Sequence, residues 1–157
     1  MHVCVSLVVD WGMDKEELKK SLFDAIQRLE NDGLVDYHFR ECYLLKEDTV
    51  PTFFFELISS FSTEARKVVT QMGKTLNQSL VDFDEMIDCC MKLKGCAASI
   101  GACRISAVCT NLHQAVENNS KEECLHALND IKHEFKELRS RLNVVLKNEH
   151  KLISGVG

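Results

Sequence analysis

The sequence predicts an all-α protein, a helical bundle built from three long amphipathic helices and several shorter ones. Only 7 of its 157 residues are glycine and 1 is proline, which leaves little material for a fold rich in turns. Apolar residues recur at helical spacing from residue 14 onward. The length suits a single domain with a hydrophobic core, and no internal repeat or low-complexity tract divides it.

The first predicted helix covers residues 14–32. Asp14, followed by Glu17 three residues later, has the pattern of a capping box at its start. Residues 1–12 fit the helical pattern poorly; a strand-like arm, a disordered tail and an extension of the gene model are all left open. We therefore divide the chain into an N-terminal arm, residues 1–12, and a domain covering residues 13–157. The apolar face of the first helix holds Leu18, Leu22, Phe23, Ile26 and Leu29.

A short helix is expected at residues 35–45, followed by a long one. Asp48 and Thr49 are the expected cap of the long helix, since Pro51 is tolerated in a first helical turn. Gly73 marks the end of this helix or a bend in it. Its apolar positions are Phe54, Leu57, Ile58, Phe61, Ala65, Val68 and Met72.

Two further helices complete the prediction, at residues 82–117 and from residue 121 to about residue 150. Each follows a capping pattern in which Glu comes three positions after the cap: Asp82 with Glu85, and Ser120 with Glu123. Asn118 and Asn119 separate the two helices.

Residues 89–102 read CCMKLKGCAASIGA, a helical stretch rich in small residues. When Leu93 is taken to point into the core, a step of about 100° per residue divides the helix into two faces. The core face holds Met86, Cys90, Ala97, Ile100, Val108 and Leu112. The opposite face, expected in solvent, holds Asp84, Asp88, Met91, Gly95, Ala98 and Ala102, with Lys94 at its border.

The small residues on this outward face have two interpretations. They permit another helix of the same chain to pack closely, or they form a shallow docking surface for a partner. Gly95 and Gly101 each cost about 1 kcal/mol of helix propensity relative to alanine, so each needs a reason in packing or contact. Spacing alone does not choose between the two.

Charge and composition exclude several classes of function. A net charge of −5 argues against general binding to nucleic acid or anionic membranes. No apolar run reaches membrane-spanning length, and the first residues lack the pattern of a secretory signal. The 8 cysteines are therefore interpreted as reduced thiols in the cytosol or nucleus.

No cofactor, metal or catalytic motif is recognised. Cys89, Cys96 and Cys103 are spaced by seven, a rise of about 10.5 Å, beyond the roughly 7 Å limit between the Cα atoms of a disulfide. The same spacing separates His126 from His133, too far to share one metal ion. A redox-sensing role stays open, and it requires a thiol with a lowered pKa.

The segment Met91-Lys92-Leu93-Lys94-Gly95, followed by CAASIGA, resembles the signature of plant histidine-containing phosphotransfer proteins. In that family a phosphorylatable His precedes Gln, an apolar residue, Lys and Gly, and then a run of small residues. The resemblance extends from about Leu18 to His150. It includes Leu34-Val35-Asp36, the run Phe53-Phe54-Phe55, Phe61, Val81-Asp82-Phe83 and Glu137-Leu138.

This resemblance implies a bundle with a four-helix up-down core and shorter N-terminal helices. It also implies a function: such proteins carry phosphoryl groups between receiver domains of hybrid sensor histidine kinases, notably cytokinin receptors, and receiver domains of response regulators. Lys94 and Gly95 match the positions that help a receiver dock. The implied receiver-binding set is Asp88, Met91, Lys92, Lys94, Gly95, Ala98 and Ala102.

The chain departs from the family pattern at its centre, where Met91 occupies the acceptor position and Lys92 replaces the usual Gln. A thioether has no titratable nitrogen and is only a weak hydrogen-bond acceptor. We therefore interpret the chain as a pseudo-phosphotransfer protein that binds receivers without carrying phosphate and damps cytokinin signalling. It is expected to be monomeric, without a cofactor, and to occur in cytoplasm and nucleus.

One alternative is a bundle that has left signalling and serves as a scaffold. The other is an active carrier that uses another histidine. Six are available, although none is followed by the Lys-Gly pair: His2, His38, His113, His126, His133 and His150.

Overall fold

A computed structural model describes the backbone of residues 2–45 and 53–154, and the side chains of residues 16–45 and 53–147. Within these ranges all regular secondary structure is helical, which confirms the all-α prediction. The helices are α1 (His2–Asn31), α2 (Tyr37–Leu44), α3 (Phe53–Leu76), α4 (Phe83–Ile100), α5 (Cys103–Glu117) and α6 (Lys121–Ser154).

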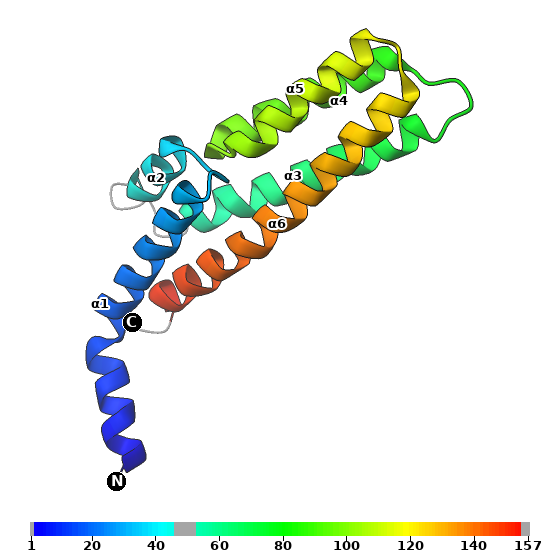
Figure 1. Cartoon of the computed structure of the whole chain (residues 1–157). Helices are drawn as coiled ribbons and strands as arrows, with labels where there is room; N and C mark the ends of the chain where they lie inside the picture. Colours follow the sequence, from blue (N-terminus) through cyan, green and yellow to red (C-terminus); the bar gives the residue numbers. More distant parts are fainter. Residues whose placement is uncertain (1, 46–52, 155–157) are drawn as a thin grey trace.

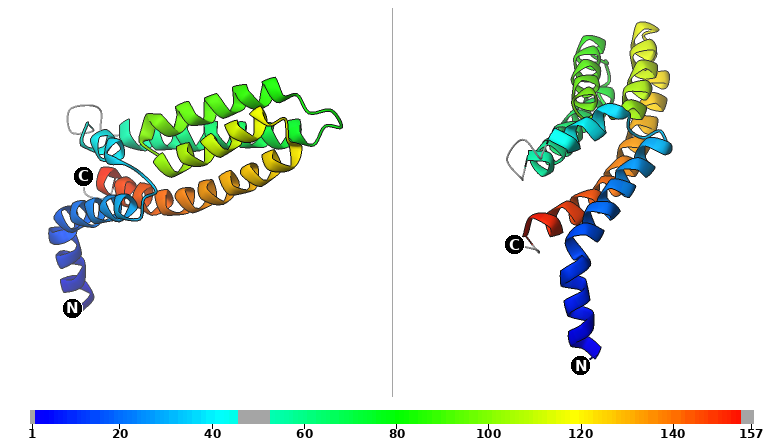
Figure 2. Two further views of the ribbon diagram at one scale, coloured as in Figure 1. Left: turned by 45° about the horizontal axis from the view of Figure 1, so that its top comes forward. Right: turned by 90° about the vertical axis from the view of Figure 1, so that its left-hand side faces the viewer.

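The last four helices form an up-down bundle (Figure 1). Each packs against its neighbour in sequence, and α3 packs against α6 to close the ring. Helix α1 lies along the C-terminal part of α6, and α2 contacts both α1 and α4 (Figure 2). None of the described helices is both long and apolar enough to cross a membrane.

The core is made by the apolar stripes of all six helices. Phe54 of α3 is fully buried and makes edge-to-face contacts with Phe39 and Tyr43 of α2, at centroid distances of 5.5 and 5.3 Å. These contacts fix α2 on the end of the bundle. Side chains of this size each contribute roughly 1.5–3 kcal/mol when fully buried. Other fully buried core residues include Leu22, Ile26, Ile58, Met86, Leu93, Ile100 and Ile131.

Several predicted helix boundaries are wrong or lie outside the described residues. Helix α1 begins at His2 and runs without interruption through Asp14, so no helix starts there. Residues 2–12 are thus helical, and the division of the chain after residue 12 stays a prediction. Helix α3 continues past Gly73 to Leu76. The expected cap at residues 48–51 lies outside the described residues.

The caps of the later helices follow the sequence prediction. Asp82 accepts a hydrogen bond from the backbone N–H of Glu85 at 3.1 Å, and the Ser120 hydroxyl accepts one from Glu123 at 3.1 Å. The Glu123 carboxylate accepts from the Asn118 amide at 3.1 Å, which ties the end of α5 to the start of α6.

The predicted single helix at residues 82–117 is two helices, α4 and α5, joined at Gly101. Gly101 adopts φ +74°, the left-handed conformation that closes helices, and the N–H of Ala102 donates to the carbonyl of Ala97 at 2.8 Å. A side chain at Gly101 would collide with the Asp36 carboxylate and approach the Phe39 nitrogen to 2.8 Å. The chain therefore reverses here, and the turn packs on the first residues of α2.

We expect Gly101→Ala to destabilise the protein by at least about 2 kcal/mol, because it adds left-handed strain to a steric clash. Chemical denaturation monitored by circular dichroism measures the change. A variant as stable as the parent would contradict the role assigned to this turn.

Candidate functional site

The outward face of α4 carries a strip of exposed residues, here called the α4 strip: Asp88, Met91, Gly95 and Ala98. Their spacing of three and four residues places them on one side of the helix. Met91 lies at the centre of the strip and is 57% exposed. Leu93, taken as the core direction, is fully buried, so the predicted facing of α4 is confirmed.

Two exposed lysines flank Met91 on opposite sides. The ammonium of Lys94 donates to the Thr110 hydroxyl of α5 at 3.4 Å, so Lys94 lies on the α5 side. Lys92 lies on the other side. It is close enough to Cys89 for its positive charge to oppose the burial that raises the pKa of that thiol. This side borders α3. Cys96 shares a face of α4 with Cys89, and the pKa of its thiol is raised by burial and by the nearby Glu64 carboxylate of α3. The strip is thus a small, shallow surface bordered by positive charge.

Ala102 does not belong to this surface, and its predicted exposure is wrong. Its side chain is fully buried because α4 ends at Ile100 and the Gly101 turn directs the next residue into the core. The same turn places Cys103 at the start of α5, so Cys89, Cys96 and Cys103, although spaced by seven, do not lie on one helix.

The two glycines of this segment, Gly95 and Gly101, have different structural roles. Gly101 is required by the turn, as described above. Gly95 is exposed, and no atom lies within 4 Å of the position that a Cβ would occupy. Packing of another helix of this chain therefore does not explain Gly95, and open space lies above its backbone. The docking interpretation at Gly95 stays a prediction.

Thr110 is a residue of this surface that the sequence did not indicate. It lies 16 positions after Lys94, and only the antiparallel pairing of α4 and α5 brings the two together. Had the helix been continuous, as expected, the two residues would have been about 24 Å apart.

The cysteines near the α4 strip do not form a reactive centre. Burial raises the pKa of the Cys89, Cys96 and Cys103 thiols. A hydrogen bond with Cys109 lowers the pKa of Cys90 to about 7, but Cys90 is 1% exposed and its sulfur donates to the Cys109 carbonyl at 3.2 Å. No described thiol combines exposure with a lowered pKa, as a redox sensor requires. Among the described residues, no group of three side chains could hold a metal ion.

The described histidines lie on three other helices. His38 on α2 and His126 and His133 on α6 are exposed. His113 on α5 lies beside Cys90, the residue before Met91, and its Nε2 pairs with the Glu117 carboxylate at 3.0 Å. The side chains of the remaining two histidines lie outside the described residues.

The four-helix bundle matches a known protein family, the Hpt domain. The model of that family matches residues 56–141, from α3 into α6 and more than half of the chain. The chain belongs to this family of phosphorelay carriers.

Its relatives include plant proteins. Histidine-containing phosphotransfer protein 1 of Arabidopsis thaliana is 27% identical over 92% of this chain and 94% of its own length. Pseudo histidine-containing phosphotransfer protein 6 of the same plant is 24% identical over 93% of this chain and 96% of its own length. The X-ray structure of a histidine-containing phosphotransfer protein from rice superposes with a TM-score of 0.85 at 26% identity, covering 90% of this chain and 99% of that one.

We expect Gly95→Ala to raise the free energy of unfolding by about 1 kcal/mol, because alanine favours the helix and meets no neighbour there. Urea denaturation of the parent and the variant measures the difference. A loss of stability would show that Gly95 is held by packing inside the chain.

Proposed function

We propose that this chain is a pseudo histidine-containing phosphotransfer protein. It binds receiver domains of hybrid sensor histidine kinases and of response regulators without carrying phosphate, and so acts as a negative regulator of cytokinin signalling in cytoplasm and nucleus. The observation that carries the proposal is Met91, 57% exposed at the centre of the α4 strip, where the family signature has its acceptor histidine.

The chemistry of the acceptor position separates binding from transfer. In a relay, an imidazole nitrogen attacks the phosphorus of a receiver phospho-aspartate, a P–N bond forms, and the aspartate carboxylate leaves. The thioether of Met91 has no nitrogen and no proton to release, so it cannot form this bond. The chain keeps the docking surface and lacks the atom that would hold the phosphoryl group. It is therefore an adaptor and not an enzyme.

The charges on either side of Met91 favour a receiver as the partner. A receiver presents a cluster of acidic residues around its phosphorylated aspartate, and Lys92 and Lys94 would face that cluster. Opposite charges of this kind speed association and fix orientation more than they raise affinity. The open space above Gly95 and the small side chain of Ala98 allow the two surfaces to approach closely.

Sequence identity alone does not separate the carrier from the pseudo type. The Arabidopsis carrier and the Arabidopsis pseudo protein are 27% and 24% identical to this chain, a difference too small to decide. A rice protein named pseudo histidine-containing phosphotransfer protein 5 is 28% identical over 79% of this chain. The distinction therefore rests on the residue at position 91.

We expect no acid-labile label on this protein after incubation with a receiver domain that carries ³²P-phosphoaspartate. Met91→His should gain label, because it restores a nitrogen on an intact surface. Label on the unmodified protein would overturn the proposal, and single His→Gln variants, beginning with the described His113, would then identify the acceptor.

We expect Lys94→Glu to weaken receiver binding by about tenfold, because it reverses a charge complementary to the receiver. Calorimetry with an isolated receiver domain measures the change. The matched control is Lys132→Glu, an equal charge change on α6 that should leave the affinity unaltered. Equal effects of the two variants would show that only net charge matters.

A further inference from the structure

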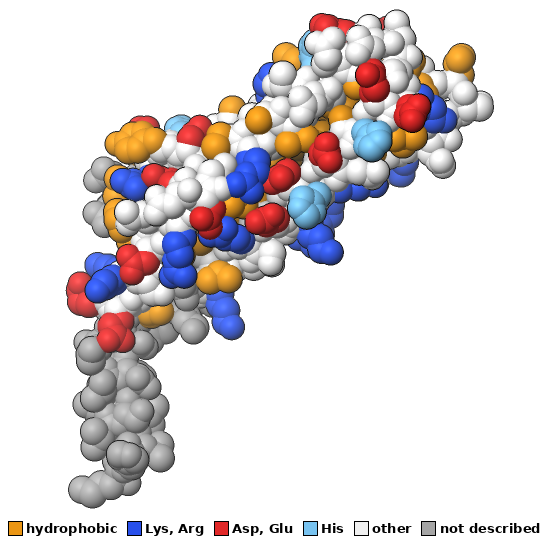
Figure 3. Space-filling model, in the orientation of Figure 1, with side chains coloured by type: hydrophobic (Ala, Val, Ile, Leu, Met, Phe, Trp, Pro, Cys, Tyr) orange, Lys and Arg blue, Asp and Glu red, His pale blue; other side chains and the backbone are white. Residues whose placement is uncertain are grey.

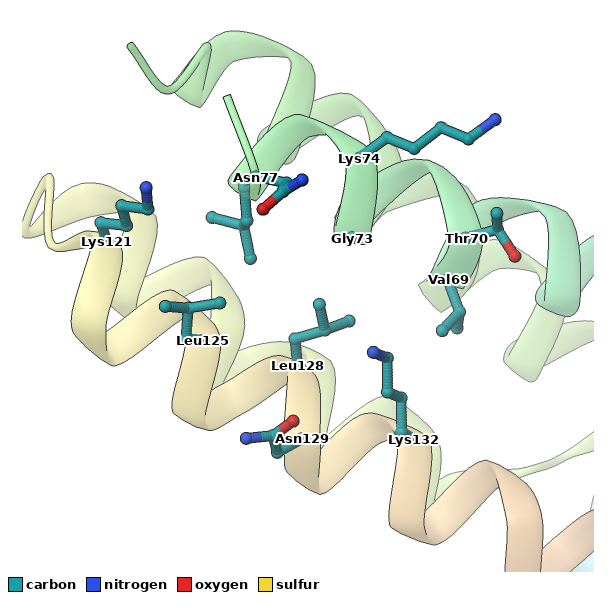
Figure 4. A pocket seen from close by; sticks show the side chains of 11 residues that line it. Val69, Thr70, Gly73, Lys74, Asn77, Lys121, Leu125, Leu128, Asn129 and Lys132 are labelled. Atoms are coloured by element: carbon teal, nitrogen blue, oxygen red, sulfur yellow. The ribbon is translucent and has the colours of Figure 1, made fainter. Parts of the chain in front are cut away.

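A groove runs between α3 and α6, two helices that do not carry the α4 strip. It lies over the C-terminal half of α3 and the first part of α6, and its volume is about 660 Å³ (Figure 4). The groove belongs to a different side of the bundle from Met91, since α4 packs against α3 and α5. The proposed receiver-binding surface does not include this groove.

The groove is positively charged in a chain whose net charge is −5. Its lining includes Lys74, Lys121 and Lys132 and no Asp or Glu. The groove on the opposite edge of α6, toward α5, has the reverse composition, with Glu123 and Asp130 and no Lys or Arg. Helix α6 thus separates positive charge on one edge from negative charge on the other. Figure 3 shows Lys and Arg side chains gathered along the lower right edge, where α3 and α6 run side by side.

The lysines of the groove are not neutralised within the described part of the chain. Lys74 and Lys132 have no acidic partner there, and Lys121 donates to the backbone carbonyl of Gln78 at 3.4 Å, which leaves its charge uncompensated. In Figure 4 the ammonium of Lys132 reaches into the space between the two helices, near Leu128 and Val69.

Between these charges the groove is apolar. Val69, Leu76 and Leu128 form a buried floor, with exposed fractions of 8%, 1% and 2%. Leu125 stands beside them on α6 and is 43% exposed, so its side chain has apolar surface left to bury. A purely ionic ligand would leave this surface in water.

Gly73 provides a second, independent observation at the same place. It lies inside α3, its φ is not in the left-handed region, and no atom lies within 4 Å of the position of a Cβ. Glycine is less favourable than alanine in a helix interior, and neither a turn nor a neighbour in this chain requires it. Its effect is to leave the backbone of α3 open toward the groove.

We propose that this groove docks an acidic amphipathic helix of a partner protein. Lys121 and Lys132 are 11 residues apart, about 16 Å along α6, which matches three turns of a helix and exceeds the size of a phosphate or sulfate. Apolar side chains on such a helix would cover Leu125 and the buried floor of the groove. Its carboxylates would pair with the groove lysines. Gly73 would let its backbone approach α3, the arrangement by which amphipathic helices bind grooves in other proteins.

The probe is a capped 14-residue peptide of two repeats of Glu-Leu-Leu-Glu-Glu-Leu-Glu, titrated into the ¹⁵N-labelled full chain. We expect amide shifts confined to residues 69–77 and 121–132. Two peptides serve as matched controls, one with Gln in place of Leu and one with Lys in place of Glu. Both should bind at least about tenfold more weakly, because each removes one of the two components of recognition.

Two variants test the groove itself. Lys132→Glu and Gly73→Leu should each weaken the peptide by about tenfold, the first by reversing a charge and the second by filling the space. Lys94→Glu, beside the α4 strip, should leave peptide affinity unaltered, and thermal unfolding of each variant verifies that it is folded. The proposal is overturned if the Gln peptide binds as well as the Leu peptide, if the shifts map elsewhere, or if Lys132→Glu and Lys94→Glu act equally.

Discussion

The left-handed turn at Gly101 is the constraint on which the arrangement of the helices depends. It ends α4, starts α5 two residues later, and accepts a hydrogen bond from the Asp36 N–H at 2.8 Å through its carbonyl. Arg104, in the first turn of α5, donates to the Asp32 carbonyl and lies 3.6 Å from the Glu134 carboxylate of α6. One tight turn therefore fixes the bundle, the end of α1 and the start of α2 relative to one another.

The surface around Met91 follows from this turn. Because α5 returns antiparallel to α4, Thr110 comes within hydrogen-bonding distance of Lys94, and Cys90 contacts the Cys109 carbonyl. One lysine is thus held on the α5 side of the strip while Lys92 extends on the α3 side. A position in the centre of the strip contacts solvent and not the core, so the fold places no packing demand on it. A thioether or an imidazole can occupy this position without cost to the bundle, so the proposed docking does not require an acceptor nitrogen.

Charge is distributed unevenly over the surface of the bundle. A net charge of −5 suggests a uniformly acidic surface, yet exposed lysines lie on both sides of the α4 strip and in the groove between α3 and α6. Both places also contain a helical glycine, Gly95 or Gly73, with open space above it. Glycine inside a helix lowers stability, so each is better explained by a surface that approaches from outside than by packing from within.

The sequence by itself determined the all-α class, the caps at Asp82 and Ser120, the inward direction of Leu93 and the exposure of Met91. These features depend on helical periodicity and on hydrogen bonds between residues close in the chain, which local sequence specifies. Only the tertiary structure decided that Gly101 ends a helix and that Ala102 is buried. A glycine within a helical pattern fits a continuous helix as well as a turn, and the contact with α2 that selects the turn joins residues more than 60 positions apart.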